Sequence, residues 1–257
     1  MSDLLNLRQE ARARMPAVVA PPHLRKATAQ TWRARMRNEY GSAHVFEGLA
    51  DQLKALGQSA EIVAEVERFA LEERKHGALC GAVVEAMEEE AVTPPLESTE
   101  YPTHPEVSLL EGTVRNLLSI CCLSETVAVA LIGAERLEMP DGPLKTLLTE
   151  IYGDECGHSN FGWRLLPTLL EAQEVDEALI ERLGRYLRVA FAHLEKHELM
   201  HLPDGPPPPP EGAALGLCSG RDARKLFYAT VTRLIVPGLE SHGLPARHAW
   251  ENRCFGS

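Results

Sequence analysis

Two Glu-x-x-His pairs stand out in the sequence, because each lies inside an apolar helical pattern. Glu73 and His76 occur in ALEERKHGALC, and Glu155 and His158 occur in IYGDECGHSNFGW. Three-residue spacing places a carboxylate and an imidazole on one face of a helix, where both can bind the same metal ion. One such pair is weak evidence, because Glu and His are common on solvated helix faces. Two pairs, each in the middle of an apolar stripe, indicate a buried metal site.

The two stripes follow the alternating three- and four-residue spacing of a buried helix face. The stripe around the first pair consists of Ile62, Val66, Phe69, Glu73, His76, Cys80, Val83 and Met87. The stripe around the second pair consists of Leu144, Leu148, Ile151, Glu155, His158, Gly162, Leu165 and Leu169. In both, the ionisable residues occupy positions where a core leucine would otherwise stand.

Two further helical segments each offer one carboxylate. Glu125 is the only charged residue in SICCLSETVAVALIGA, so we expect its side chain to be buried. The first helical segment offers Glu39 and Glu47. Glu39 continues an apolar stripe with Trp32, Met36, Ala43, Phe46, Ala50 and Leu53, whereas Glu47 falls one residue off this stripe. We therefore predict Glu39 as the ligand.

Four carboxylates and two imidazoles would then converge inside a helical bundle. Left empty, this arrangement would bury several charges without partners, at a cost of several kcal/mol per ion. Two divalent cations would cancel the four negative charges. Carboxylate and imidazole ligands suit iron or manganese, and the absence of cysteine argues against a closed zinc site. The sequence predicts two iron ions, with manganese or a mixed Mn/Fe pair as the alternative, held by Glu39, Glu73, His76, Glu125, Glu155 and His158.

Long helical segments must position these residues. We predict helices at about 24–56, 60–90, 107–139 and 143–172, and strand patterns are nearly absent. Short connections within the first and the second pair of helices favour antiparallel hairpins. Between the pairs lies AVTPPLESTEYPTHPEV, whose prolines favour an extended chain. At roughly 3.3 Å per residue this segment can run the length of the bundle. The prediction is an all-α four-helix bundle with a long crossover between helices 2 and 3.

The remaining chain predicts additional C-terminal helices. We expect two of them at about 175–201 and 221–235, with a short helical tail around 244–252. A Pro-rich linker at 203–212 is interpreted as a spacer. We expect a single domain over 1–257, with a core at about 24–172 and a C-terminal extension at about 175–252. The role of His193, His197 and His201, spaced every four residues, stays open; a solvated helix edge is favoured over a metal site.

The combined pattern resembles the ferritin-like di-iron carboxylate proteins, which include bacterioferritin, rubrerythrin and the ribonucleotide reductase small subunit. In that family one Glu from each of two helices joins one Glu-x-x-His from each of the other two. The six predicted ligands match this order over about residues 30–170. The resemblance implies a ferritin-like bundle. It also implies that the acid before each pair, Glu72 and Asp154, orients the histidine of the opposite helix.

This resemblance implies a non-haem di-iron oxidase or oxygenase. Such an enzyme would activate dioxygen, act on an unknown small-molecule substrate and need an electron donor if it is an oxygenase. Two alternatives remain open: iron oxidation for storage, and a metal-binding bundle with a structural or interaction role. The additional C-terminal helices favour the enzyme, because a storage bundle needs no such cover. The absence of a CxxC motif argues against a rubrerythrin-type electron chain.

Composition limits the partners and the location. With 37 acidic and 26 basic residues, the formal charge of −11 disfavours binding to nucleic acid. The N-terminus lacks the apolar core of a signal peptide, and no run approaches the roughly 20 apolar residues of a membrane span. Six cysteines without a CxxC pair suggest reduced, mostly buried thiols. We therefore expect a cytoplasmic protein without a membrane anchor, and a homodimer is compatible with the sequence.

Overall fold

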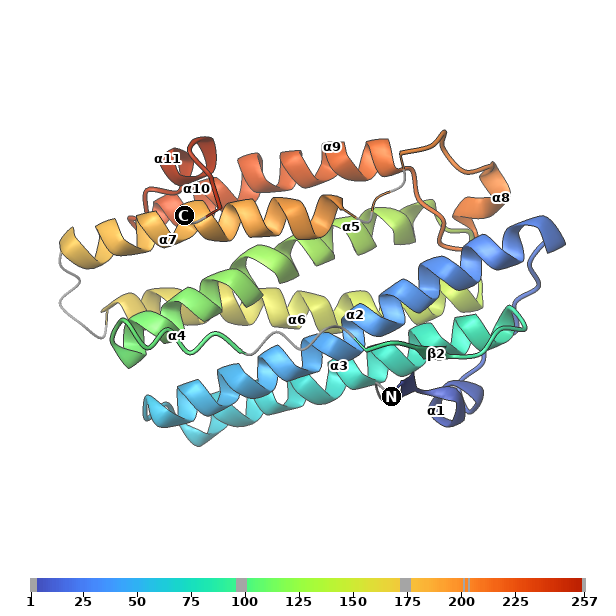
Figure 1. Ribbon diagram of the computed structural model, residues 1–257, viewed down its shortest axis with the longest axis horizontal. Helices are drawn as coiled ribbons and strands as arrows, with labels where there is room; N and C mark the ends of the chain where they lie inside the picture. Colours follow the sequence, from blue (N-terminus) through green and yellow to red (C-terminus); the bar gives the residue numbers. More distant parts are fainter. Residues whose placement is uncertain (1–3, 96–100, 172–176, 201, 203, 256–257) are drawn as a thin grey trace. The chain divides into compact units, whose positions relative to one another are not determined.

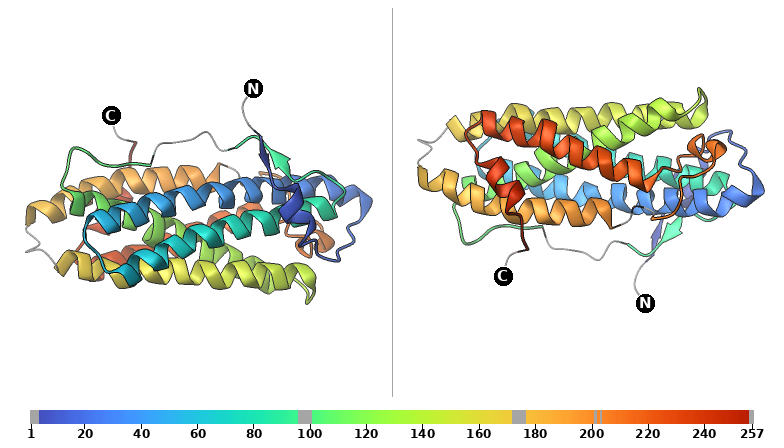
Figure 2. Two further views of the ribbon diagram at one scale, coloured as in Figure 1. Left: turned by 90° about the horizontal axis from the view of Figure 1, so that it is seen from below. Right: turned by 90° about the horizontal axis from the view of Figure 1, so that it is seen from above.

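The computed structural model describes residues 4–95, 101–171, 177–200, 202 and 204–255. Helices dominate these residues, which confirms the all-α class (Figure 1). The exceptions are β1 (Leu5–Asn6) and β2 (Val92–Thr93), which pair antiparallel with Leu5 opposite Thr93 (Figure 2). The sequence pattern did not indicate these strands, because two residues are too few to show a period of two.

The chain divides into two compact units. The first contains Met1–Pro102, Ala134–Asp154 and Pro208–Cys218, and the second contains Thr103–Gly133, Glu155–Pro207 and Ser219–Ser257. Helices α5 (Glu125–Glu138) and α6 (Pro143–Glu171) each contribute residues to both units. The expectation of a single domain over 1–257 stays a prediction.

A helical hairpin forms the main part of the first unit. Its helices α2 (Pro22–Ala55) and α3 (Ala60–Ala86) lie side by side in Figures 1 and 2. Gly57 supplies the turn with φ +77, and the side chain of Ser59 accepts a hydrogen bond from the Ile62 amide, which caps α3. Helix α3 ends before the predicted residue 90, because Glu88 takes a positive φ of 65.

Two short helices complete the first unit, and neither was expected. Helix α1 (Arg8–Arg12) lies near the N-terminus, and α8 (Pro210–Ala213) begins inside the predicted linker at 203–212. Pro203 of that linker lies outside the described residues. A proline at the start of α8 suits a helix N-terminus, because its missing N–H would have no helical partner there.

In the second unit, the predicted third helix is interrupted by a π-helical segment. Helix α4 (Leu109–Leu117) leads into the π-helix η1 (Leu118–Ser124), and α5 follows from Glu125. The i→i+5 hydrogen bonds of a π-helix add a residue to the turn, so a regular three- and four-residue spacing is displaced after it. Leu118, Cys121 and Glu125 are buried at this spacing, but the next two positions, Ala128 and Ile132, are only half-buried.

The C-terminal helices complete the second unit. They are α7 (Glu177–Leu199), α9 (Gly220–Thr230) and α11 (Ala246–Glu251), near the predicted positions. The predicted helix at 221–235 extends further than expected. After α9, the chain continues through the π-helix η2 (Val231–Ile235) and α10 (Val236–Ser241), despite Pro237. Pro237 is the second residue of α10 and follows the π-helix directly.

Among the described residues, one helix is longer and more apolar than the sequence analysis expected. Leu109–Glu138 forms a helix long and apolar enough to cross a membrane. Its apolar residues are interrupted by few charges, and Glu125, one of these charges, is only 7% exposed. One such helix is weak evidence, because the core helix of a soluble protein passes the same test, and this helix is consistent with a core helix.

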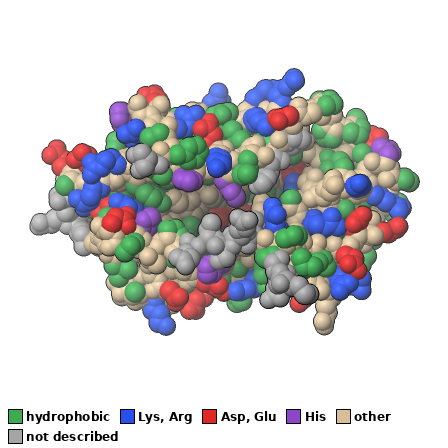
Figure 3. Space-filling view, in the orientation of Figure 1, with side chains coloured by type: hydrophobic (Ala, Val, Ile, Leu, Met, Phe, Trp, Pro, Cys, Tyr) green, Lys and Arg blue, Asp and Glu red, His purple; other side chains and the backbone are tan. Residues whose placement is uncertain are grey.

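The face drawn in Figure 3 carries charges of both signs. Lys and Arg side chains are scattered among Asp and Glu side chains on this face and do not gather into one basic patch. The sequence as a whole has an excess of acidic residues, with a formal charge of −11.

Candidate metal centre

The first unit brings together Glu39 from α2 and the pair Glu73 and His76 from α3. The His76 side chain is fully buried, and Glu73 is 2% exposed. His76 Nδ1 lies 3.4 Å from Glu39 Oε2 and 4.0 Å from Glu73 Oε2. One ring nitrogen therefore faces two carboxylates inside the protein.

The second unit repeats this arrangement with Glu125 from α5 and the pair Glu155 and His158 from α6. His158 is fully buried, and Glu155 is 2% exposed. His158 Nδ1 lies 3.2 Å from Glu155 Oε2 and 3.7 Å from Glu125 Oε2. Each predicted Glu-x-x-His pair thus presents Nδ1 to a carboxylate from a neighbouring helix.

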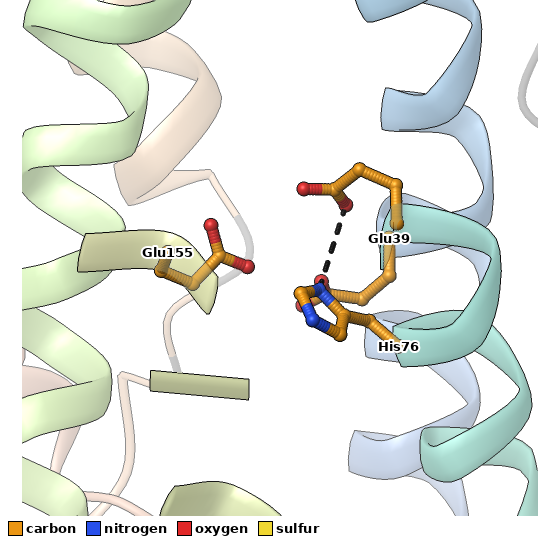
Figure 4. Close-up of side chains that lie close together, drawn as sticks. Glu39, His76 and Glu155 are labelled. Atoms are coloured by element: carbon orange, nitrogen blue, oxygen red, sulfur yellow. Dashed lines mark ion pairs between the residues drawn. The ribbon is translucent and has the colours of Figure 1, made fainter. Parts of the chain in front are cut away.

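Within the described residues, the six side chains form two overlapping groups that could each hold a metal ion. In each group the potential ligand atoms lie within 4.8 Å of one another. The first group consists of Glu39, Glu73, His76 and Glu155, and the second consists of Glu73, Glu125, Glu155 and His158. Figure 4 draws three members of the first group, Glu39, His76 and Glu155, and marks the ion pair between Glu39 and His76 with a dashed line. The protein therefore has a buried acidic and histidine cluster able to hold a metal ion.

The donor atoms of this cluster fit divalent cations. They are carboxylate oxygens and imidazole nitrogens, without sulfur, which is the set that suits iron or manganese. Burying several carboxylates in one place is unfavourable unless a positive charge compensates them. The cluster thus supplies both the ligands and the negative charge that a pair of divalent ions would need.

The apolar stripes explain why these polar residues point inward. All eight residues of the predicted α6 stripe are buried, and in the α3 stripe only Ile62 is half-buried. A helix that buries an apolar face carries every residue of that face inward, including the ionisable ones. The sequence spacing therefore identified the inward positions of both pairs.

The structure also separates Glu39 from Glu47. The Glu39 side chain is 17% exposed and faces His76, whereas the Glu47 side chain is 43% exposed and forms an ion pair with Arg74. Glu47 belongs to neither group of potential ligands among the described residues. These positions agree with the preference for Glu39 that the stripe gave.

Asp154 contacts the buried histidine of the other helix, as the family resemblance implied. Its Oδ2 lies 3.0 Å from His76 Nε2. The hydrogen bonds with His76 and with Lys75 together lower the pKa of Asp154 to about 2, against the opposing effect of burial. Because an ionised carboxylate only accepts, Nε2 must donate, and the neutral ring then carries its lone pair on Nδ1. Asp154 thus prepares the nitrogen that faces the carboxylates.

The corresponding role of Glu72 stays a prediction. Its side chain lies on α3 and has an ion-pair contact of 3.7 Å with Arg68, one turn away. Its side chain is 18% exposed, so it is largely covered by the protein.

Sequence reasoning missed a hydroxyl network beside the second pair. Trp163 Nε1 donates to Thr126 Oγ1 at 3.0 Å, and Thr126 Oγ1 lies 2.8 Å from Ser159 Oγ. Thr126 directly follows Glu125, and Ser159 directly follows His158. This adjacency was the available signal, but hydroxyl residues are too common for adjacency alone to indicate a network.

The histidines of α7 lie outside this cluster. His193 packs edge-on against Phe255, with ring centroids 5.2 Å apart. His193 and His197 belong to neither group of potential ligands among the described residues, and His201 lies outside those residues. The preference for a solvated helix edge stays a prediction.

The six cysteines are free thiols, as expected. Cys80, Cys121 and Cys122 are buried, whereas Cys156 and Cys218 are half-buried and Cys254 is exposed. Burial raises the pKa of the Cys80 and Cys121 thiols well above the ordinary range, so both are held in the protonated form. Protonated thiols are poor metal ligands, which agrees with a cluster built from oxygen and nitrogen.

No family model matches the chain, and no curated protein matches it. The functional interpretation therefore rests on the residues and geometry of the cluster.

Proposed function

We propose that this chain is a non-haem di-iron oxidase or oxygenase that activates dioxygen for reaction with a small organic substrate. The observation that carries the proposal is the overlap of the two potential ligand groups. Both groups contain Glu73 and Glu155, and each group adds one histidine and one further glutamate. Two ions that share two carboxylates are the expected occupants of such an arrangement.

The proposal assigns a role to each ligand. Glu39 and His76 would hold one ion, and Glu125 and His158 would hold the other. Glu73 and Glu155, which belong to both groups, would help to hold both ions. Four carboxylates supply four negative charges, which two divalent ions neutralise. The proposal includes a ferritin-like order of helices, with α2, α3, α4–α5 and α6 as the four helices of the bundle.

When bound in such a site, a pair of reduced iron ions supplies electrons to dioxygen. The chain itself contributes binding, orientation and exclusion of water. The fully buried rings of His76 and His158 keep water away from the nitrogen atoms that face the carboxylates. Asp154 holds the proton on His76 Nε2 and so keeps Nδ1 available as a ligand.

Packing of the C-terminus favours an enzyme over a storage bundle. Arg253 donates to both carboxylate oxygens of Glu195 on α7, at 2.6 and 2.8 Å. Trp250 of α11 packs edge-on against Phe191 of α7, with ring centroids 5.3 Å apart. The C-terminal helices are therefore built into the second unit, where they could cover a substrate. A storage bundle does not need this addition.

The other parts of the proposal concern the surroundings of the enzyme. We place it in the cytoplasm, with an electron donor if the reaction is an oxygenation, and we expect neither nucleic acid nor a membrane as a partner. A homodimer is compatible with this proposal. Iron storage remains the second candidate, because the same ligands also suit oxidation of Fe²⁺ itself.

Oxygen uptake tests the proposal. Anaerobic addition of about two Fe²⁺ per chain, the number that the ligand set holds, followed by air should give one burst of oxygen consumption. Continued uptake of many irons per particle, with a cage-sized assembly in size-exclusion chromatography, would instead support storage. A bundle with only a structural role consumes no oxygen, and Glu125→Ala would then behave like the native protein. Loss of the burst in Glu125→Ala supports the di-iron proposal.

A further inference from the structure

The two residues inside the first Glu-x-x-His pair are both cationic, yet they contact different partners. Arg74 forms an ion pair with Glu47, which lies outside both groups of potential ligands. Lys75 Nζ instead lies 2.7 Å from Asp154 Oδ2. Since Asp154 contacts His76, Lys75 is connected to a predicted metal ligand through one intermediate side chain.

A single oxygen atom of Asp154 makes both contacts. Oδ2 accepts from Lys75 Nζ at 2.7 Å and from His76 Nε2 at 3.0 Å. Two donors on one oxygen restrict the rotation of the carboxylate more than either donor alone. Charge-assisted hydrogen bonds of this length are among the stronger ones in proteins. Lys75 therefore helps to set the position from which Asp154 holds the His76 ring.

Glu150 holds the lysine in place from the other side. Lys75 Nζ lies 3.2 Å from Glu150 Oε1, and Glu150 precedes Asp154 by one turn of α6. Without the ammonium group, these two carboxylates at i and i+4 would repel each other. The Asp154 side chain is 24% exposed and could then turn toward water. His76 would lose its fixed hydrogen-bond acceptor.

We propose that Lys75 is a positioning residue for the metal centre, because it fixes Asp154 and Asp154 in turn fixes the His76 ring. The inference rests on the proposed function and adds a difference between the two Glu-x-x-His pairs. The second pair reads Glu155-Cys156-Gly157-His158 and has no cationic residue at the corresponding positions. Lys75 should therefore affect the ion that His76 holds and leave the ion that His158 holds unchanged.

Co²⁺ binding tests this proposal. The visible absorption of bound Co²⁺ depends on its ligands, so it follows each binding event without any enzyme turnover. In the native protein the titration should show two Co²⁺ per chain, as the two groups predict. In Lys75→Met one binding event should stay unchanged and the other should weaken about tenfold, the lower end of the effect seen when a hydrogen-bond partner of a ligand is lost. The spectrum of the weakened ion should also change, because the ring orientation changes.

Four variants act as controls. Arg74→Met removes the neighbouring cation and should leave both binding events unchanged. Lys75→Arg keeps a cation within reach of Asp154 and should restore most of the lost affinity. Asp154→Asn should weaken the same binding event as Lys75→Met. The double variant Lys75→Met/Asp154→Asn should be no weaker than Asp154→Asn alone, because Lys75 acts through Asp154.

The outcomes separate this inference from the proposed function. If the native protein binds no pair of Co²⁺, the proposed function fails and the inference fails with it. If the native protein binds two but Lys75→Met changes neither event, only the inference is overturned. Equal weakening of both events, together with a lower melting temperature of the metal-free protein, indicates a purely structural role for Lys75 and also overturns it.

Discussion

Glu39 and Glu47 both lie on α2, but only Glu39 faces the buried histidine. This difference gives the first prediction. Glu39→Gln removes the negative charge of a ligand and should weaken the binding of one Mn²⁺ at least tenfold. Glu47→Gln removes the charge of the Arg74 partner and should leave both ions in place. Metal content after gel filtration compares the two variants, and similar losses in both would contradict the assignment.

The stripe in the sequence predicted the position of Glu39 because helix spacing alone decides which face is buried. The contact of Asp154 with His76 followed only from the family resemblance. Lys75 was not predicted, because its contact with Asp154 depends on how α3 and α6 are aligned along their length. Spacing within one helix gives no information on that alignment.

Glu198 on α7 gives a prediction about pH. Burial raises the pKa of Glu198 to about 7. A carboxyl group whose pKa is higher in the folded than in the unfolded state makes the protein more stable at low pH than at high pH. This contribution to the free energy of unfolding is fully present below the unfolded pKa of about 4.3 and is lost as the pH rises to about 7. Glu198→Gln should therefore stabilise the protein by about 1–2 kcal/mol at pH 8. This is less than the full difference between the two pKa values implies, because Glu198 is only half-buried.

Urea unfolding at pH 4.5 and at pH 8 measures this effect. The advantage of Glu198→Gln over the native protein should be small at the lower pH and largest at the higher pH. Glu181→Gln, at an exposed position of the same helix, is the matched control and should show little dependence on pH. An advantage of Glu198→Gln that is independent of pH would exclude titration of this carboxyl group as the cause.

At the scale of elements, two glycines on α6 flank His158 and differ in their surroundings. A Cβ added at Gly162 would overlap Cys121 Cβ and lie 3.1 Å from the Cys121 backbone carbon, whereas one added at Gly157 meets nothing within 4 Å. Gly162→Ala should destabilise the protein by about 1–3 kcal/mol, because α6 and η1 must move apart. Gly157→Ala should be neutral or stabilise by up to about 1 kcal/mol. Thermal unfolding measures the stability of both variants. Equal stability would contradict the close packing of Gly162 against Cys121.

The long helices were predicted because their apolar spacing extends over many turns. The π-helix η1 was not, because its residues Leu118–Ser124 are almost all apolar and fit either type of helix. Its presence explains why burial follows the regular spacing up to Glu125 but not at Ala128 and Ile132. The continuation of the chain through Pro237 was missed because a proline normally predicts a helix end.

At the scale of the whole molecule, metal binding should be linked to stability. A ligand that binds only the folded state stabilises it by about 2.7 kcal/mol when its concentration is 100 times its Kd. For a chain of this length we expect a rise in melting temperature of about 5–10 °C when Mn²⁺ is added to the chelator-treated protein. Glu155→Ala removes a residue common to both groups and should abolish most of the rise. A rise of the same size in that variant would place the binding elsewhere.

The all-α class was predicted from the sequence because four long periodic segments and few strand patterns leave little alternative. Helices α1 and α8 were missed because four or five residues are too few to show periodicity. The apolar character of Leu109–Glu138 was underestimated: by length and composition this helix could cross a membrane. The ferritin-like order of the helices and the assignment of the chain to a single domain remain predictions.

The central claim is that six side chains hold two metal ions. Anomalous diffraction from crystals grown with Fe²⁺ under anaerobic conditions tests this most directly, because it locates each iron independently of any assay. We expect two iron peaks, one bound by Glu39 and His76, the other by Glu125 and His158, with Glu73 and Glu155 contacting both. Iron peaks only at other residues, or a centre without iron in a protein saturated with Fe²⁺, would contradict it.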